Sequence, residues 1–178
     1  PTMTGLPDSF VMSNDAGECG AVVTWAEPSF EDNCLTVLSN SDVQNMSFLS
    51  TGTHTVTYTG TDAAGLSVSG SFDISINDDE KPEITNPPQD VTLNTSTDEC
   101  GAIVSWDAVQ TTDNCDIVSV TSTRNSGEFF DKGTTSVTII ATDTSNNQIA
   151  HTFTVTVIDA QAPTMSGLSG PIVVQNDS

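Results

Sequence analysis

The sequence predicts an all-β fold made of tandem antiparallel β-sandwiches, and three observations lead to that prediction. Thr, Ser, Val and Ile are abundant, and β-branched side chains suit the pleated surface of a strand. Short runs of alternating apolar and polar residues are bounded by turn residues, as expected for strands with one buried face. The sequence also repeats itself along its length, which indicates several copies of one small domain.

The repeat is anchored by cysteine, tryptophan, aspartate and proline. Identical residues recur 81 positions apart, among them Cys19 with Cys100, Trp25 with Trp106, Cys34 with Cys115, Asp62 with Asp143 and Pro82 with Pro163. We therefore expect two complete sandwiches, at residues 1–80 and 81–161. Residues 162–178 are expected to form the first strand of a third repeat.

Within the first repeat the predicted strands follow one another at the spacing of an immunoglobulin-like sandwich. The last two are expected to form a hairpin whose turn begins at Asp62. A sandwich of this size buries only about 60 to 65% of the surface of its unfolded chain and is marginal without a staple, which we expect the cysteines to provide. The predicted strands are Ser9–Ser13, Ala21–Trp25, Leu35–Asn40, Asn45–Leu49, His54–Thr61 and Leu66–Ile76.

The net charge restricts the partners of the protein. Only 3 Lys and Arg residues oppose 24 Asp and Glu residues, which gives a formal charge of -21. Such a surface repels the phosphates of nucleic acids and anionic lipids, and no apolar run approaches the roughly 20 residues of a membrane helix. We expect no nucleic acid partner and no direct membrane insertion.

Acidic residues gather in the linker between the repeats and in two loops of the second repeat. In an immunoglobulin-like topology these loops open at the end where the chain enters, so the side chains are expected to converge and bind Ca2+ through hard oxygen ligands. The alternative is that these residues only cap turns. The predicted junction site comprises Asp78, Asp79, Glu80, Asp113, Asn114 and Asp143, and the incomplete sites comprise Asp32, Asn33, Asp62 and Asp159.

Each repeat carries two cysteines that stand 15 positions apart. The first precedes a strand and the second lies in the loop entering the next strand, so we expect local disulfides, each worth about 3 kcal/mol. Disulfides indicate an oxidising compartment, whereas zinc is disfavoured because neither His neighbours nor Cys-x-x-Cys spacing is present. The predicted bridges are Cys19–Cys34 and Cys100–Cys115, with Trp25 and Trp106 packed against them.

The sequence offers no repeated catalytic constellation. Its two histidines, His54 and His151, occupy unmatched positions of different repeats, whereas nucleophilic catalysis needs a base beside its nucleophile. A sandwich of this size also offers no ready cleft for paired catalytic carboxylates. We expect a non-enzymatic segment.

The motifs of both complete repeats resemble those of the HYR (hyalin repeat) family. They are Cys-Gly-Ala-x-Val-x-Trp, Asp-Asn-Cys, Gly-Thr-x-x-Val-Thr, Thr-Asp-x-x-Gly/Asn and Asp-x-x-x-Pro. The resemblance implies immunoglobulin-like modules of extracellular matrix, adhesion and bacterial surface proteins. Many members carry a second cysteine pair, but here Gly70 and His151 stand at one of its positions, so that bridge is not expected.

These observations predict a structural and adhesive spacer of a secreted or cell-surface repeat protein, stiffened by calcium at its domain junctions. Its expected partners are further repeats of the same protein, together with neighbouring copies in a fibre or a surface ligand. One alternative is a filament subunit whose strand at 170–176 enters the sandwich of a neighbouring chain. Another is an accessory module of a secreted enzyme whose catalytic domain lies elsewhere.

Overall fold

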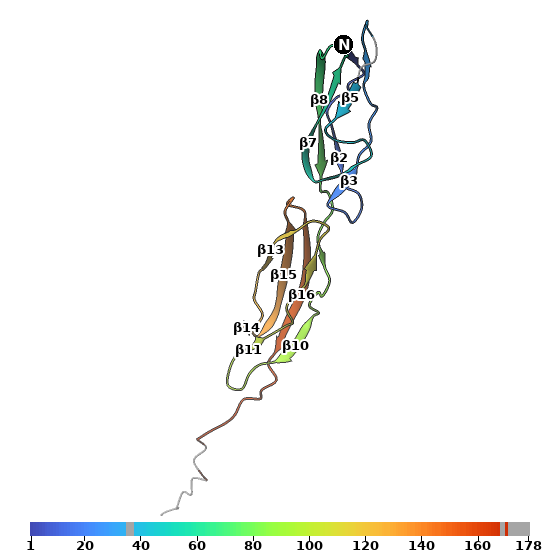
Figure 1. The fold of residues 1–178 in the computed structure, drawn as a ribbon. Helices are drawn as coiled ribbons and strands as arrows, with labels where there is room; N and C mark the ends of the chain where they lie inside the picture. Colours follow the sequence, from blue (N-terminus) through green and yellow to red (C-terminus); the bar gives the residue numbers. More distant parts are fainter. Residues whose placement is uncertain (35–37, 168–169, 171–178) are drawn as a thin grey trace, which may run out of the picture. The chain divides into compact units, whose positions relative to one another are not determined.

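The computed structural model describes residues 1–34, 38–167 and 170, which form strands and no helix. The fold is all-β and consists of tandem immunoglobulin-like β-sandwiches, as predicted (Figure 1). The chain divides into two compact units. Unit 1 comprises Pro1–Pro87, Val109–Ser122 and Ile139–His151, and unit 2 comprises Pro88–Ala108, Thr123–Thr138 and the chain from Thr152 onward.

The first repeat lies entirely in unit 1. Its larger sheet has four strands in the order β2-β8-β7-β5, and its other strands form the pairs β3–β6 and β1–β4. The long antiparallel hairpin of β7 and β8 is visible in Figure 1. The strands are β1 (Thr2–Thr4), β2 (Phe10–Ser13), β3 (Gly20–Val22), β4 (Ser29–Glu31), β5 (Leu38–Ser41), β6 (Phe48–Ser50), β7 (Gly52–Thr61) and β8 (Ser67–Asn77).

The core of the first repeat follows from the alternation in its hairpin. Every second residue of β7 and β8 faces inward, and these side chains meet Ala21 and Val23 from the opposite layer. Trp25 packs edge-on against Phe72 with ring centroids 5.7 Å apart, and its indole N–H donates to the Tyr58 hydroxyl at 2.8 Å. The buried hairpin residues are Val56, Tyr58, Phe72, Ile74 and Ile76.

The second repeat uses the same plan. One sheet has the order β10-β16-β15-β13, and the pairs β11–β14 and β12–β9 complete the pattern. In unit 2, Trp106 packs edge-on against Phe153 and Phe130, at centroid distances of 5.1 and 6.2 Å. The strands are β9 (Glu83–Ile84), β10 (Val91–Asn94), β11 (Gly101–Val104), β12 (Thr111–Thr112), β13 (Ile117–Ser122), β14 (Glu128–Asp131), β15 (Gly133–Asp143) and β16 (Gln148–Ile158).

Two strand pairings depart from the purely antiparallel expectation. β2 runs parallel to β8, with Phe10 opposite Ile74, and β10 runs parallel to β16 in the second repeat. In each repeat an early strand thus lies beside the last strand and runs in the same direction. Parallel partners need a long crossover, and the intervening strands of the repeat provide it.

The short strands were harder to predict than the hairpins. β1 and β4 pair with each other through residues such as Met3 and Phe30, although neither strand was predicted. Of the predicted strand Leu35–Asn40, residues 35–37 lie outside the described residues. Residues 162–167 form no strand, and 168–169 and 171–178 also lie outside, so the third repeat and the exchanging strand at 170–176 stay predictions.

Candidate cation site at the repeat junction

Asp143 is a fully buried acid at the end of β15. Its Oδ1 atom accepts hydrogen bonds from the backbone N–H groups of Ser145 and Asn147, both at 2.8 Å, and thereby closes the turn to β16. The side chain is 0% exposed. Its Oδ2 atom has no hydrogen-bond partner among the described residues.

Asp113 lies in the loop that precedes β13. Its Oδ2 atom accepts a hydrogen bond from the backbone N–H of Cys115 at 2.9 Å, in the manner of a local Asx turn. The Oδ1 atom is buried and has no partner among the described residues. The local turn therefore uses one carboxylate oxygen and leaves the other available for a ligand.

Asp78 follows β8 and belongs to the linker, and its side chain is only 6% exposed. Its Oδ1 atom accepts from the Glu80 backbone N–H at 3.2 Å and from the Asn114 amide at 3.3 Å. The Asp78 carbonyl accepts from the Asn147 amide at 3.0 Å. Its Oδ2 atom again lacks a partner within the described part of the chain.

Asp78 and Asp113 come together within unit 1, and the negative charge of Asp143 acts on Asp113, so linker and loop residues form one acid cluster. Carboxylate oxygens of Asp78 and Asp113 lie, with the Cys115 sulfur, all within 4.8 Å of one another. The sulfur is bonded in a disulfide and is not a thiolate ligand. The available donors of the cluster are therefore oxygens.

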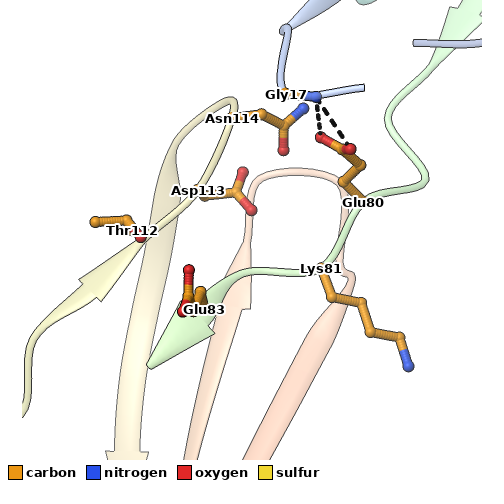
Figure 2. Close-up of a pocket in the computed structure, with 7 residues that line it drawn as sticks. All are labelled: Gly17, Glu80, Lys81, Glu83, Thr112, Asp113 and Asn114. Carbon is orange, nitrogen blue, oxygen red and sulfur yellow. Dashed lines mark hydrogen bonds between the residues drawn. The ribbon is translucent and has the colours of Figure 1, made fainter. Parts of the chain in front are cut away.

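The electrostatics of the cluster favour a positive ion. Burial raises the pKa of Asp113, and the negative charges of Asp78, Asp143 and Glu80 raise it further, against the lowering effect of the Cys115 N–H. Among the ion pairs of the described residues, none involves these acids. Figure 2 shows the Lys81 side chain directed away from Asp113 and Glu80.

The remaining predicted residues surround the cluster unequally. Glu80 lines an open hollow beside Asp113 (Figure 2), where both its oxygens accept from the Gly17 N–H at 3.1 and 3.0 Å. Asn114 lines the same hollow. Asp79 instead accepts from the Ser13 hydroxyl at 2.5 Å, so it anchors the linker to the first repeat.

Asn147 is a contributor that sequence reasoning missed. Its backbone N–H binds Asp143 and its side-chain amide binds the linker carbonyl of Asp78. The first repeat has Leu66 at the corresponding position. This replacement of Leu by Asn inside a matched turn was the only available signal.

The corresponding loops of the first repeat show the same local geometry. Asp32 accepts from the Cys34 N–H at 2.9 Å, and Asp62 accepts from the N–H groups of Ala64 and Leu66. The α-ammonium group of Pro1 lies 2.8 Å from Asp32 Oδ2. This hydrogen bond, aided by the charges of Asp32 and Asp62, raises the pKa of the ammonium group.

Two further residues of the predicted incomplete sites also have defined places. Asn33 lines a hollow together with Pro1 and Asp32. Asp159 accepts from the Gln161 N–H at 3.1 Å, just as Asp78 accepts from Glu80. Unlike Asp78 it is exposed, and it lies 3.6 Å from the Lys132 ammonium.

The predicted disulfide pairs Cys19–Cys34 and Cys100–Cys115 are wrong. The structure joins Cys19 to Cys115, with a Cα–Cα distance of 4.8 Å, and leaves Cys34 and Cys100 as exposed free thiols. The bridge thus connects the start of β3 to the loop of Asp113. It holds the acid cluster against the first repeat covalently.

The physical reason is the extended path between the two cysteines of a repeat. Cys19 lies beside the start of β7, where its carbonyl accepts from the Thr51 N–H at 3.2 Å, and Cys34 lies beyond β4, next to Asp32. β7 is 10 residues long, which corresponds to about 33 Å. A disulfide requires Cα atoms about 4.4 to 6.8 Å apart, so cysteines at opposite ends of one sandwich do not pair.

The fold and site define a class of protein: a tandem β-sandwich repeat with a bridged, acid-rich joint. The HYR domain family model matches residues 1–76 and again residues 77–157. The chain belongs to the HYR domain family, which confirms the resemblance seen in its motifs.

Three relatives share about a third of their aligned residues with this chain. Hyalin of Strongylocentrotus purpuratus is 31% identical over 163 residues, which cover 89% of this chain and 14% of that protein. Hyalin of Lytechinus variegatus is 30% identical over 165 residues, which cover 89% of this chain and 31% of that protein. A third relative is the sushi, von Willebrand factor type A, EGF and pentraxin domain-containing protein 1 of Rattus norvegicus. It is 30% identical over 149 residues, which cover 79% of this chain and 4% of that protein. The chain spans less than a third of each relative.

The comparison with solved structures matches protocadherin chains at TM-scores below 0.5. Human mucin-like protocadherin EC1-2 aligns with a TM-score of 0.40 and 9% identity, covering 89% of this chain and 99% of that chain. Protocadherin gammaB7 EC3-6 aligns with a TM-score of 0.39 and 17% identity, covering 88% and 50%.

The family and the hyalin relatives identify the chain as an extracellular or cell-surface repeat module. The Cys19–Cys115 bridge agrees with this location, because structural disulfides persist in oxidising compartments. No helix of the described residues is long and apolar enough to cross a membrane.

Proposed function

We propose that this chain is a calcium-stiffened spacer of an extracellular adhesive repeat protein. Ca2+ would bind the acid cluster through Asp78, Asp113 and Asp143, with the side-chain oxygen of Asn114 and the carboxylate of Glu80 as further ligands after rotation. Because the ligands come from the linker and from two loops of the second repeat, the ion would fix the joint between the repeats.

One observation carries the proposal: three buried carboxylate oxygens, one from each segment, have no hydrogen-bond partner among the described residues. An unpaired buried charge is costly, so buried carboxylates are normally paired, hydrogen-bonded or bound to a metal. The three acids also repel one another. A divalent cation would relieve both penalties at once.

The chemistry of the donors favours calcium over other ions. Ca2+ takes 6 to 8 oxygen ligands at about 2.3 to 2.6 Å and tolerates irregular geometry. Zinc prefers His and thiolate ligands, and the cysteine at this site is in a disulfide. Mg2+ keeps several waters and demands a near-ideal octahedron, which three fixed carboxylates do not readily supply.

The first test is calcium titration by calorimetry, combined with thermal unfolding and small-angle scattering in calcium and in chelator at one ionic strength. We expect a raised melting temperature and a narrower range of interrepeat geometries with calcium. A magnesium arm at equal concentration controls for screening of the overall charge. Identical melting and scattering curves in calcium and chelator would reject the proposal.

A matched pair of variants separates the site from its turn. Asp143→Asn retains the oxygen that closes the turn and removes the unpaired charge, and Asp62→Asn makes the same change in the same turn of the first repeat. We expect Asp143→Asn to weaken calcium binding at least tenfold, about 1.4 kcal/mol, and Asp62→Asn to leave the junction affinity unchanged. Equal losses in both variants would contradict a junction site.

The two alternative functions predicted from the sequence stay predictions. Strand exchange depends on residues 170–176, of which the structure describes Gly170 alone. An accessory role in a secreted enzyme depends on a catalytic domain outside this chain.

A further inference from the structure

Two cysteines are left as exposed free thiols, although their repeat positions match those of the bonded pair. Cys34 stands 81 positions before Cys115, and Cys100 stands 81 positions after Cys19. Each free thiol therefore has a bonded counterpart whose partner is visible in the structure.

The backbone surroundings of the free thiols match those of their counterparts. The N–H of Cys34 binds Asp32, and the N–H of Cys115 binds Asp113, both at 2.9 Å. The matching carbonyls are also paired in the same way, from the Thr51 N–H to Cys19 at 3.2 Å and from the Lys132 N–H to Cys100 at 2.8 Å.

Local geometry thus gives no reason why one cysteine of each type is bonded and the other is free. The difference is the presence of an adjoining repeat. Cys19 has a following repeat that supplies Cys115 at a sequence separation of 96 residues. Among the described residues, Cys34 has no preceding repeat and Cys100 has no following repeat.

We propose that the cysteines form a relay of inter-repeat disulfides, in which each repeat bonds its first cysteine to the second cysteine of the repeat that follows. By this rule Cys100 bonds the counterpart of Cys115 in a following repeat, and Cys34 bonds the counterpart of Cys19 in a preceding repeat. The partner of each exposed thiol is therefore the thiol of another repeat of this family, placed one period away.

The chemistry of each bond is an ordinary oxidation. Two thiols lose two protons and two electrons and form one S–S bond. The electrons reduce an external disulfide, such as oxidised glutathione, to two thiols by thiol–disulfide exchange. The relay requires no cation, so its success or failure is independent of calcium binding.

The consequence is mechanical. Repeats joined by the backbone linker and noncovalent contacts alone can separate from each other under load. One disulfide per joint adds a second covalent connection beside the linker. In such a relay Cys34 and Cys100 each form one half of a further bridge.

The first measurement is the free-thiol count of the intact chain, labelled under denaturing conditions after refolding in oxidised and reduced glutathione. We expect two labelled thiols, at Cys34 and Cys100, with Cys19 and Cys115 linked. Peptides linking Cys19 to Cys34 or Cys100 to Cys115 would overturn the relay.

The decisive experiment extends the chain by one period. A second copy of residues 82–162 is inserted after residue 162, so that the inserted Cys115 follows Cys100 by the same 96 positions that separate the bonded pair. We expect two labelled thiols again, although the extended chain has two additional cysteines. Cys115→Ser in the inserted copy alone should raise the count to three.

The same samples provide controls for folding and for disulfide bonds between molecules. The Cys19–Cys115 bridge reports that the original joint has folded, and a non-reducing gel shows whether bonds have formed between molecules. Four labelled thiols beside an intact Cys19–Cys115 bridge, or thiols lost only into cross-linked dimers, would overturn the proposal.

Discussion

At the scale of single residues, the junction acids each divide their two oxygens between two tasks. Asp113 and Asp143 use one oxygen for a backbone turn and bury the other without a partner. Asp78 does the same with the linker. The turn bonds explain why Asp is present, and the unpaired oxygens require a further explanation that turn formation does not supply.

Removing the charge of Asp113 should have opposite effects with and without calcium. In chelator, Asp113→Asn relieves repulsion from Asp78, Asp143 and Glu80, so we expect the variant to be more stable than the wild type by about 1 kcal/mol. In saturating calcium it loses a ligand and should be less stable. Thermal unfolding in both buffers checks this, with Asp32→Asn as control. A stability change of the same sign in calcium and in chelator would contradict the prediction.

The pH dependence in chelator should carry the signature of Asp113. Its pKa is raised in the folded chain above the ordinary aspartate value of 3.8, so the folded state binds this proton more readily than the unfolded state. The contribution of Asp113 to stability therefore grows as pH falls through the raised pKa, and is complete below about 3.8.

The measurement is the unfolding free energy of the wild type minus that of Asp113→Asn across this acid range. Subtraction removes the opposite trends of Asp32 and Glu128, whose pKa values are lowered by hydrogen-bonded cations. In calcium the trend should reverse, because protons compete with the ion for the carboxylate. If this difference in unfolding free energy does not change with pH in chelator, burial and neighbouring charges do not raise the pKa of Asp113.

At the scale of elements, the pairs β3–β6 and β11–β14 depend on a glycine covered by an aromatic ring. A Cβ atom on Gly20 would lie 2.2 Å from the Leu49 carbonyl oxygen and 2.6 Å from the Phe48 ring. Gly101 meets the Phe130 carbonyl and the Phe129 ring in the same way. The close approach of the two strands therefore requires glycine at both positions.

We expect Gly20→Ala to destabilise the first repeat by about 2 kcal/mol, because a backbone carbonyl must move to make room. The neighbouring Val22 is 49% exposed, so Val22→Ala should change stability by only about 0.5 kcal/mol. Urea unfolding of the three proteins checks the difference. Equal stabilities for Gly20→Ala and the wild type would show that the strands separate without cost.

At the scale of the whole molecule, the joint between the repeats combines a disulfide, an acid cluster and a linker bonded to the first repeat. Asp79 and Glu80 hold the linker against Ser13 and Gly17, and the Asn114 amide reaches the Glu18 carbonyl at 3.1 Å. These contacts hold the linker and the loop of Asp113 beside the first repeat, so the proposed ion would meet ligands that are already placed. Such preorganisation reduces the entropic cost of binding.

Removing the bridge should therefore affect both stability and calcium affinity. Cys19→Ser with Cys115→Ser opens a loop spanning 96 positions, for which the loop-entropy value is about 4 to 5 kcal/mol. We expect a lower melting temperature and weaker calcium binding. Cys34→Ser with Cys100→Ser removes exposed free thiols and should change neither. Equal behaviour of the two double variants would indicate that the bridge does not support the joint.

The sequence by itself determined the all-β class, the two repeats and the HYR family, because alternation and an 81-residue period are properties of neighbouring and equivalent positions. It also predicted that Asp113, Asn114 and Asp143 face the linker, since the loop ends of an immunoglobulin-like sandwich follow from its topology. The hydrogen-bond partners of those acids could not be predicted from the sequence, and Asn147 was missed.

Only the tertiary structure decided which cysteines meet. The 15-residue spacing within a repeat favoured local bridges, but the chain between Cys19 and Cys34 is extended along the sandwich and separates them. The structure likewise showed that Asp79 turns to Ser13 while Asp78 remains in the cluster. Side-chain partners across a joint depend on where two folded surfaces meet, and that information is not present in the local pattern of either repeat.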